Sequence, residues 1–513
     1  MNDFTVAEVT VRQLGAILPE IILMIGGMLI IILDTAAGTK RDSGTGFMAI
    51  AVLTLAVAFV GAVFQLGLAE PLTDLPLVTV DAFSGFMKLT IIGGMILVAV
   101  AGGVYMNQRV AGRGEFWSLF IFVTIAMSFA VSASNLLLIF LAIEFLSITS
   151  YLLVGFMRES RRSTEAGLKY FLYGAVASSV MLYGMSFLYG ATGALDLSAI
   201  AVSLAEQPEL YVIVLPAILM ILVGLGFKTS LVPFHQWTPD TYEGAPTPIT
   251  AYLSTASKAA GFAVMTRLLI TGLGSYQEAW VPLLSGLAIL TMTVGNLIAL
   301  RQTNVKRMLA YSSIAQAGYM LMGLASVVPS SQANPADLTM NGLNGLMLYL
   351  FAYLFTNVGA FLVVLAVEEQ TGSSDLSSFR GLHQRSPGLA WAMFVFLLSL
   401  TGIPLTGGFI GKFFVFGAAV QHQYWVLVGA AAINAAIAAG YYLNVVRYMF
   451  FPPSELSLDE ERDLPAPARW RPALAIQLVV LVCVVATIWI GVYPPNVIEW
   501  ANDASQQLLT LHF

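Results

Sequence analysis

Long apolar runs recur along the chain, and short polar segments separate them. Fourteen of these runs are long enough to form helices of about 20 residues, the length that crosses a bilayer. Their approximate ranges are 15-33, 47-67, 83-106, 115-132, 134-156, 165-190, 210-236, 245-270, 280-300, 306-328, 341-367, 388-419, 424-450 and 472-493. The pattern predicts an all-α polytopic membrane protein with about 14 transmembrane helices.

The charges between the runs are consistent with this count. If the amino terminus lies outside, 16 of the 23 Lys and Arg residues fall in inside segments, and only Arg12 falls in an outside one. The inside residues are Lys40, Arg41, Arg109, Arg113, Arg158, Arg161, Arg162, Arg301, Lys306, Arg307, Arg380, Arg385, Arg447, Arg462, Arg469 and Arg471. Because inside loops of membrane proteins are enriched in Lys and Arg, we expect both termini on the outer side.

Composition agrees with a membrane protein and narrows its chemistry. The chain is 58% hydrophobic and only 10% charged, whereas a soluble domain carries about 25% charged residues. Its single cysteine, Cys483, lies within an apolar run, so the chain alone cannot build a disulfide, zinc or iron–sulfur site. Metal-ligand spacings, nucleophile triads and phosphate loops are not found in the sequence, and no nucleic-acid partner is expected.

Two parts of the chain match each other at one constant offset of 179 residues. The matches are 192–198 (TGALDLS) with 371–377 (TGSSDLS), 259–262 (AAGF) with 438–441 (AAGY), and Tyr170 with Tyr349. Five spans separate the members of each pair, so the two copies point in opposite directions across the membrane. Inverted repeats are typical of secondary-transporter folds, in which ion sites lie near the midplane at discontinuous helices.

The same spacing places two helix breaks. Pro233 lies in the seventh span, and Pro404 lies with several glycines in the twelfth. Proline removes a backbone donor and clashes with the preceding turn. The freed carbonyls are tolerated in a membrane only where protein or water satisfies them. We therefore expect discontinuous seventh and twelfth helices that face a polar interior, with ordinary proline kinks as the alternative.

Four charged residues lie inside apolar spans and are the candidate proton-translocating groups: Glu144, Lys228, Lys258 and Lys412. Ionisable side chains inside a membrane are costly and usually mark ion or proton traffic. Glu144 has no charge partner on its own span, so Lys228 is the expected partner. Lys258 lies about 18 Å beyond Pro246, near the membrane centre. A static ion pair and a lysine that extends to the surface are the structural alternatives.

Three further residues have weaker assignments. His235, beside Pro233, is an accessory candidate because histidine exchanges protons near neutral pH. Lys169 begins the sixth span and is either an interfacial anchor or part of the route of proton entry. Lys88 lies near the outer end of the third span, and we expect its side chain to extend to the surface.

Several stretches are similar to the antiporter-like subunits of respiratory complex I. They are LPEIILMIGGMLIIILD near the start, IEFLSITSYLLVGF around Glu144, GFKTSLVPFHQWTPDTYEGAPTPITAYLSTASKAAGFA through Lys228 and Lys258, VKRMLAYSSIAQAGYMLMG, and TGIPLTGGFIGKF. The resemblance covers essentially the whole chain. It is strongest to the smallest of the three large antiporter-like subunits, because no long lateral helix follows the fourteenth span.

The resemblance implies an architecture and a function. It implies an N-terminal three-helix segment (1-114), two inverted five-helix repeats (115-270 and 280-450), and a loop with a C-terminal helix (451-513). It also implies a Glu144–Lys228 pair, a central Lys258 and an exit-side Lys412. Such a subunit moves protons outward, driven by quinone reduction elsewhere in the complex. We expect a bacterial inner membrane, with an organellar membrane as the alternative.

The resemblance further implies what this chain does not contain. FMN, iron–sulfur clusters and quinone belong to partner subunits, and this chain holds no cofactor. The expected neighbours are antiporter-like subunit M and small subunit K, with lipids around them and an indirect link to the peripheral redox arm. A subunit of a multisubunit Na⁺/H⁺ antiporter, or of a hydrogenase- or ferredoxin-type complex, is the alternative.

Overall fold

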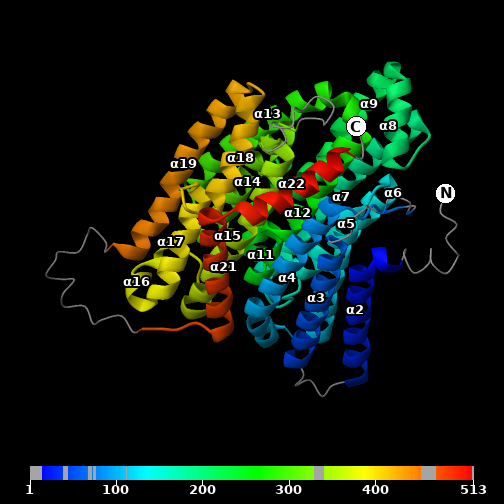
Figure 1. Cartoon of the computed structure of the whole chain (residues 1–513). Helices are drawn as coiled ribbons and strands as arrows, with labels where there is room; N and C mark the ends of the chain where they lie inside the picture. Colours follow the sequence, from blue (N-terminus) through cyan, green and yellow to red (C-terminus); the bar gives the residue numbers. More distant parts are fainter. Residues whose placement is uncertain are drawn as a thin grey trace.

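The described part of the chain is almost entirely helical (Figure 1). The computed structural model describes residues 14–37, 44–66, 72, 75, 77–110, 112–327, 340–451 and 469–510. These ranges contain no strand, only isolated β-bridges. The loop charges Arg12, Lys40, Arg41 and Arg462 lie outside the described residues.

Eleven helices of the described chain are long and apolar enough to cross a membrane, so the protein is a multi-pass membrane protein. They are α2 (Leu18–Ala37), α3 (Gly44–Leu66), α4 (Ala82–Arg109), α5 (Arg113–Ser132), α6 (Leu136–Val154), α7 (Arg161–Thr192), α9 (Tyr211–Thr229), α13 (Gln277–Ala299, after the short turn Gly274–Tyr276), α15 (Gly342–Thr371), α19 (Trp425–Phe450) and α21 (Leu474–Val492).

Three expected spans are not among these eleven. The first, 245-270, is divided into α11 (Thr247–Ser254) and α12 (Ala256–Arg267). The second, 306-328, corresponds to the unbroken α14 (Val305–Ala325), which is rich in polar residues. The third, 388-419, is divided into α17 (Pro387–Thr401) and α18 (Gly407–Gln421). These helices are either too short or too polar to qualify by length and composition.

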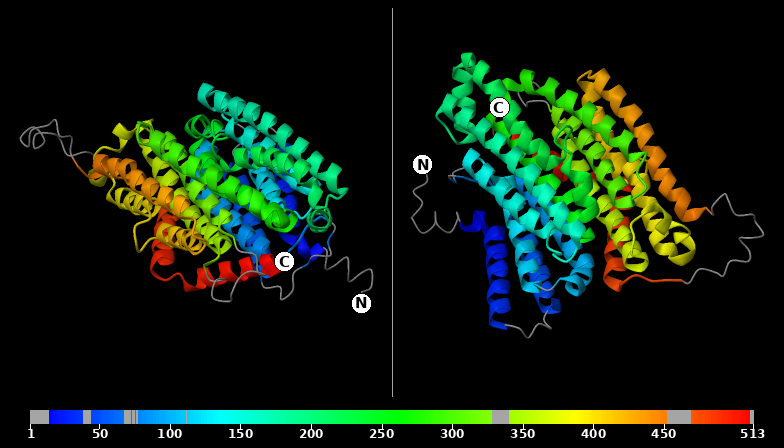
Figure 2. Two further views of the ribbon diagram at one scale, coloured as in Figure 1. Left: turned by 90° about the horizontal axis from the view of Figure 1, so that it is seen from above. Right: turned by 180° about the vertical axis from the view of Figure 1, so that it is seen from behind.

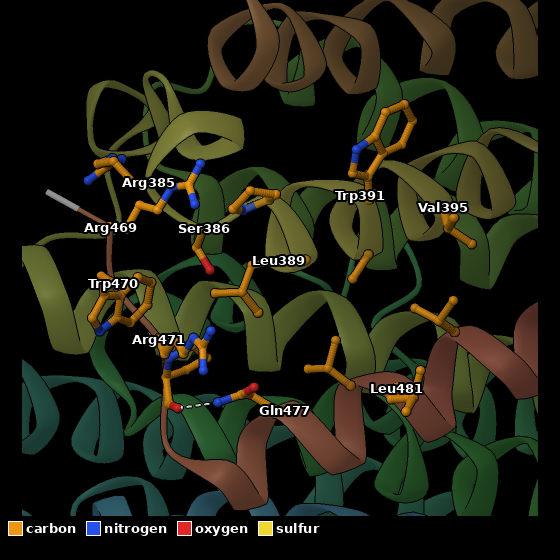
Figure 3. Close-up of a pocket in the computed structure, with 16 residues that line it drawn as sticks. Arg385, Ser386, Leu389, Trp391, Val395, Arg469, Trp470, Arg471, Gln477 and Leu481 are labelled. Atoms are coloured by element: carbon orange, nitrogen blue, oxygen red, sulfur yellow. Dashed lines mark hydrogen bonds between the residues drawn. The ribbon is translucent and has the colours of Figure 1, made fainter. Parts of the chain in front are cut away.

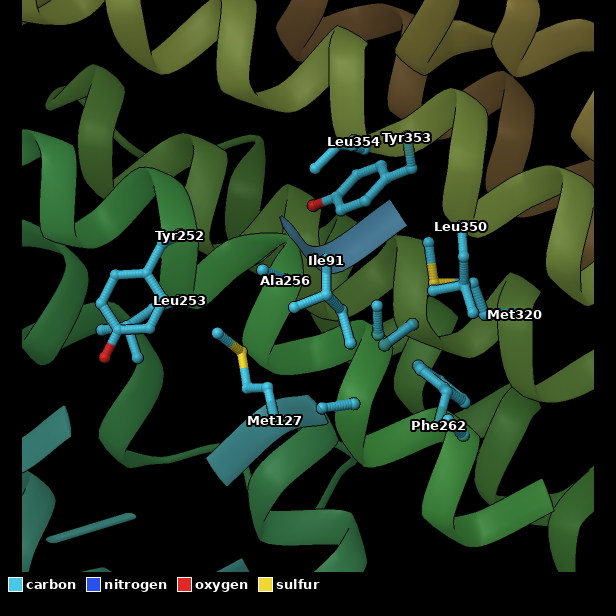
Figure 4. Packing of buried hydrophobic residues seen from close by; sticks show 14 of the residues in the cluster. Ile91, Met127, Tyr252, Leu253, Ala256, Phe262, Met320, Leu350, Tyr353 and Leu354 are labelled. Carbon is cyan, nitrogen blue, oxygen red and sulfur yellow. The ribbon is translucent and has the colours of Figure 1, made fainter. Parts of the chain in front are cut away.

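The helices form one bundle in which α15 lies centrally. Nearly nine-tenths of the residues in its most apolar stretch are buried. The helix packs against α4, α11, α14, α17, α18 and α21. The N-terminal helices α2 and α3 lie at one end of the bundle, and α19 lies at the other (Figures 1 and 2). Close-packed apolar side chains from α4, α5, α11, α12, α14 and α15 fill the centre between these ends (Figure 4).

Four α-helices of the described chain lie outside the fourteen expected spans: α8 (Leu197–Glu206), α10 (Trp237–Gly244), α16 (Leu382–Arg385) and α22 (Pro495–Thr510). The short α8 follows α7, and its N-terminus is capped by the Asp196 carboxylate. The terminal α22 crosses one face of the bundle and packs on α4 and α15 (Figure 1). It buries an apolar stripe at helical spacing and is polar on its other side, so it is too amphipathic to resemble a spanning segment.

Close packing of α13 on α14 gives a test of the fold. A methyl group at Gly295 would come within 2.7 Å of the backbone nitrogen of Ala315, whereas one at Gly286 on the same helix would meet nothing within 4 Å. We expect Gly295→Ala to destabilise the protein by about 1–3 kcal/mol, because backbone cannot yield as a flexible side chain can. Thermal unfolding of the detergent-purified chain measures this. Gly286→Ala is the matched control, and equal melting temperatures for the two variants would contradict the helix packing.

Candidate functional site

Lys228 lies at the end of α9, where the seventh span is interrupted. Residues 230–236 separate α9 from α10 (Trp237–Gly244), and Pro233 lies within this interruption. The ammonium group is buried, and it donates to the Ser147 hydroxyl at 3.2 Å and the Tyr170 hydroxyl at 3.3 Å. Gly261 of α12 lies against the end of α9, since a Cβ there would lie 2.9 Å from the Thr229 Cγ2 and 3.4 Å from the Lys228 Cγ.

The expected direct ion pair between Glu144 and Lys228 is not formed. No nitrogen–oxygen contact within 4.0 Å joins them in the described chain, and the buried Glu144 Oε1 has no hydrogen-bond partner. Instead Ser147, one helical turn after Glu144 on α6, binds the lysine. The Ser147 hydroxyl, and not the Glu144 carboxylate, is therefore the group on α6 that binds Lys228.

Lys258 lies just after a helix break that no proline marks. The eighth span is interrupted at Thr255, and the hydroxyls of Ser254 and Thr255 both bond back to the Ala251 carbonyl there. Such bonds compete with helix hydrogen bonding. The buried ammonium of Lys258 donates to the backbone oxygen of Ser313 at 2.7 Å and to its hydroxyl at 2.6 Å.

Lys412 is coordinated by a helix end. Residues 402–406, which include Pro404, separate α17 from α18. The ammonium of Lys412 donates to the carbonyls of Leu400 and Thr401, both at 2.9 Å, and lies 4.7 Å from the centre of the Tyr319 ring. Carbonyls at a helix C-terminus lack intrahelical partners and carry the negative end of the helix dipole. The lysine is buried rather than extended to the surface.

One helix, α14, joins the surroundings of Lys258 and Lys412. Its Ser313 binds Lys258, and the adjacent Ser312 shares a hydrogen bond with the Tyr442 hydroxyl. Gln316 then donates to Tyr442 at 3.1 Å and to the Leu400 carbonyl at 2.9 Å. Because that carbonyl also accepts from Lys412, polar groups on α14 connect the two lysine sites.

The two accessory candidates occupy different surroundings. His235 lies half-buried in the break between α9 and α10, and its side chain makes no hydrogen bond to Glu144 or to the lysines within the described chain. Lys169 lies at the start of α7 in a partly exposed charge cluster. It pairs with Glu165 at 2.9 Å and with Asp240 at 2.8 Å, and Asp240 also binds Arg307.

The expectation that Lys88 extends to the surface is wrong. Lys88 is 1% exposed and pairs with Glu20 of α2 at 2.8 Å. Gln65 accepts from the same ammonium at 3.1 Å, and Ser128 donates to Glu20 at 2.7 Å. Proximity to a span end suggested surface exposure, but α2, α3 and α5 enclose α4 at this depth. The sequence does contain an indication of this ion pair, because the first span holds a single acid, Glu20.

A second buried pair was also missed. Arg267, at the end of α12, donates two hydrogen bonds of 2.9 Å to the Asp81 carboxylate that caps α4. Both side chains are almost fully buried. This bidentate pair joins the N-terminal segment to the helix that carries Lys258.

Comparisons with known proteins place the sequence among a group of relatives. The family described as "NADH:quinone oxidoreductase/Mrp antiporter, TM" matches residues 133–438. A protein named NADH-quinone oxidoreductase subunit N from Desulforamulus reducens is 41% identical over 430 residues, covering 84% of this chain and 86% of that protein. One of the same name from Trichlorobacter lovleyi is 38% identical over 509 residues, covering 98% of this chain and 99% of its own.

A solved structure has the same architecture. A chain of the respiratory complex I from Thermus thermophilus with bound aureothin superposes with a TM-score of 0.76. It is 32% identical, and the match covers 94% of this chain and 98% of that one. The all-helical, antiporter-like membrane fold is therefore shared with a protein of known structure.

The buried Glu20–Lys88 pair gives a second prediction. Lys88→Met leaves Glu20 charged and buried without its partner, which costs about 3–5 kcal/mol. The double variant Glu20→Gln, Lys88→Met removes both charges, so we expect it to regain most of the lost stability. Thermal unfolding and the amount of chain in membranes measure both effects.

The half-exposed Arg109–Glu369 contact of 3.6 Å is the matched control. Arg109→Met should change stability by less than about 1 kcal/mol, since exposed pairs contribute little. A Lys88→Met variant as stable as the Arg109→Met variant would contradict the closed ion pair.

Proposed function

Because the chain belongs to the family of NADH:quinone oxidoreductase and Mrp antiporter transmembrane subunits, we propose that it is subunit N of a respiratory complex I and translocates protons. One observation carries the assignment of residues: three buried lysines that have no carboxylate within 4.0 Å in the described chain, each bound by carbonyl or hydroxyl oxygens beside a helix break. Charged groups of this kind inside a membrane mark ion pathways.

The proposed path runs from Lys228 through Lys258 to Lys412. Glu144 and Ser147 lie at its start, and the polar groups of α14 form its second half. Lys228 contacts α12 through Gly261, one turn from Lys258, so the two lysines influence each other across a short distance. His235 and Lys169 remain accessory groups, with Lys169 at the inner entrance.

The mechanism follows from charge repulsion. Lysine can lose and regain a proton, whereas arginine stays charged. Protonation of Lys258 from the inside is coupled to separation of Lys228 from Glu144, and the unpaired Lys228 ammonium then repels the proton on Lys258 toward Lys412. The structure has Ser147 on the lysine and no direct ion pair, the arrangement that this separated state requires. Moving one charge against 100 mV costs about 2.3 kcal/mol, which quinone chemistry on other subunits must supply.

We infer the finer topology from paired features of the two halves. Both α7 and α15 end at a glycine with positive φ, Gly193 and Gly372. Three residues later, an aspartate in each half forms a β-bridge with the asparagine that caps another helix: Asn135 with Asp196, and Asn304 with Asp375. These features support a repeat of the chain (115-270 and 280-450). We propose in addition that the two repeats are inverted within fourteen spans, with both termini outside a bacterial inner membrane.

The remaining assignments concern the complex. The protein is a subunit of a multisubunit assembly, part of an NADH:quinone oxidoreductase. We propose that subunits M and K are its direct neighbours and that lipids fill the rest of its perimeter. FMN, iron–sulfur clusters and quinone are assigned to other subunits, so this chain contributes translocation and no redox centre.

Substitution of Lys258 by arginine tests whether Lys258 transfers a proton or only supplies a fixed positive charge. If Lys258 must release its proton in each cycle, Lys258→Arg fails as Lys258→Met does, because a guanidinium is not deprotonated. We expect both variants to lower proton pumping and coupled NADH oxidation at least about fivefold. Purified complex in vesicles measures both rates. Arg109→Lys is the control, and normal pumping by Lys258→Arg would overturn the assignment.

Sodium dependence distinguishes a complex I subunit from the alternative, a subunit of an Mrp-type Na⁺/H⁺ antiporter, which the family description also includes. In vesicles that contain the assembled complex, we expect NADH to drive proton movement in sodium-free buffer. We also expect a sodium gradient without NADH to drive none. Proton exchange that requires sodium and no electron donor would instead identify the antiporter.

A further inference from the structure

A basic groove opens between the first turns of α17 and α21 (Figure 3). Its volume is about 570 Å³, and it lies away from the four proposed translocation residues, none of which lines it. Arginines and tryptophans surround the mouth, and aliphatic side chains continue along the two helices. The groove therefore has one polar end and one apolar end.

The charges at the mouth are all positive. Arg385, Arg469 and Arg471 line it, and its lining contains no Asp or Glu. Within the described chain, none of the three arginines forms an ion pair. Arg385 donates only to the backbone oxygens of Ser378 and Arg380, and its buried Nε has no partner. Burial lowers the pKa of this guanidinium, and no carboxylate offsets the lost hydration.

Backbone dipoles add to this positive potential. Both α17 and α21 begin at the mouth, and neither N-cap residue, Ser386 or Ala473, supplies a side-chain hydrogen bond to its helix. The first backbone N–H groups of a helix carry partial positive charge and favour anions. Two such ends and three arginines line the same end of the groove, so the preferred occupant carries negative charge there.

The rest of the groove is apolar and open to the membrane. Trp391 and Leu481 are 58% and 57% exposed, and Val395 and Val484 continue the wall along α17 and α21. Tryptophans at a helix end are typical of the boundary between lipid headgroups and acyl chains. Trp391 and Trp470 both flank the opening (Figure 3). An occupant therefore needs an anionic head and a hydrocarbon tail.

We propose that this groove binds an anionic phospholipid, with its phosphate among Arg385, Arg469 and Arg471 and an acyl chain along α17 and α21. Basic pockets between membrane helices bind such headgroups, and each basic residue strengthens the interaction. Three arginines make binding roughly a hundredfold tighter than to a neutral groove of the same shape. The proposal concerns lipid binding alone and does not depend on proton translocation.

The test uses the purified full-length chain in detergent with added dioleoyl phosphatidylglycerol or dioleoyl phosphatidylcholine. We expect phosphatidylglycerol to raise the melting temperature of the wild type, and phosphatidylcholine or inorganic phosphate to have a much smaller effect. Native mass spectrometry should show a retained anionic lipid. The triple variant R385Q/R469Q/R471Q should require roughly a hundredfold more phosphatidylglycerol for the same shift.

Two further variants exclude simpler explanations. R109Q/R301Q/R447Q removes the same number of charges from scattered positions and should respond like the wild type. Val395→Trp keeps the arginines but fills the apolar wall, so it should also weaken lipid retention. An inorganic phosphate effect as large as that of phosphatidylglycerol would show that the mouth binds free anions, which overturns the lipid assignment.

Equal lipid responses of the wild type and R385Q/R469Q/R471Q would also overturn the proposal. The sequence just before Arg469 is acidic, so this segment is the competing occupant. Changing Glu455, Asp459, Glu460, Glu461 and Asp463 to their amides tests it. A wild type that binds no lipid, together with an amide variant that does, would assign the arginines to the chain's own carboxylates.

Discussion

The central constraint on this structure is that a buried ammonium group needs oxygen ligands. The backbone carbonyls of a continuous membrane helix are already paired within it, so its side-chain hydroxyls or a shared carbonyl must serve, as they do for Lys228 and Lys258. Two other buried lysines take their ligands from helix ends. The end of α17 leaves the Leu400 and Thr401 carbonyls for Lys412, and the end of α10 leaves the Ala245 carbonyl for Lys306 at 2.9 Å. Helix breaks and buried lysines are therefore two parts of one arrangement.

The same constraint explains why α14 is polar. It stays unbroken, so its carbonyls are mostly paired within the helix. The Ser313 carbonyl also accepts from Lys258, and the other polar contacts come from side chains. Ser313 binds Lys258, while Ser312 and Gln316 extend hydrogen bonds toward Tyr442 and Leu400. The same helix contributes apolar side chains such as Met320 to the close packing at the centre of the bundle (Figure 4). Polar contacts in a low-dielectric interior are strong when satisfied, so this helix couples the two lysine sites more effectively than an exposed network would.

Periodicity and residue chemistry predict much of the fold and of the candidate site. The spans, the interruptions near Pro233 and Pro404, and the unusual charges at Glu144, Lys228, Lys258 and Lys412 all stand out in an apolar background. What they could not supply is how the helices pack. No proline or glycine marks the break at Thr255 in the sequence. The contact of Ser147 with Lys228 depends on how α6 and α9 are brought together in the fold. Terminal α22 was missed because an amphipathic helix of 16 residues does not resemble a span.

Lys88 differs from the lysines of the proposed proton path in the kind of group that binds its ammonium. It is as deeply buried as Lys258, yet Glu20, Gln65 and Ser128 form a closed set around it, and its positive charge is neutralised on site. Lys258 and Lys412 are instead bound by neutral oxygens, with no carboxylate within 4.0 Å in the described chain. A neutralised pair gains nothing by losing a proton, because the remaining carboxylate would be buried alone. A lysine held by dipoles can exist in either protonation state with its ligands in place. Burial by itself therefore does not identify a proton carrier, and the nature of the partner does.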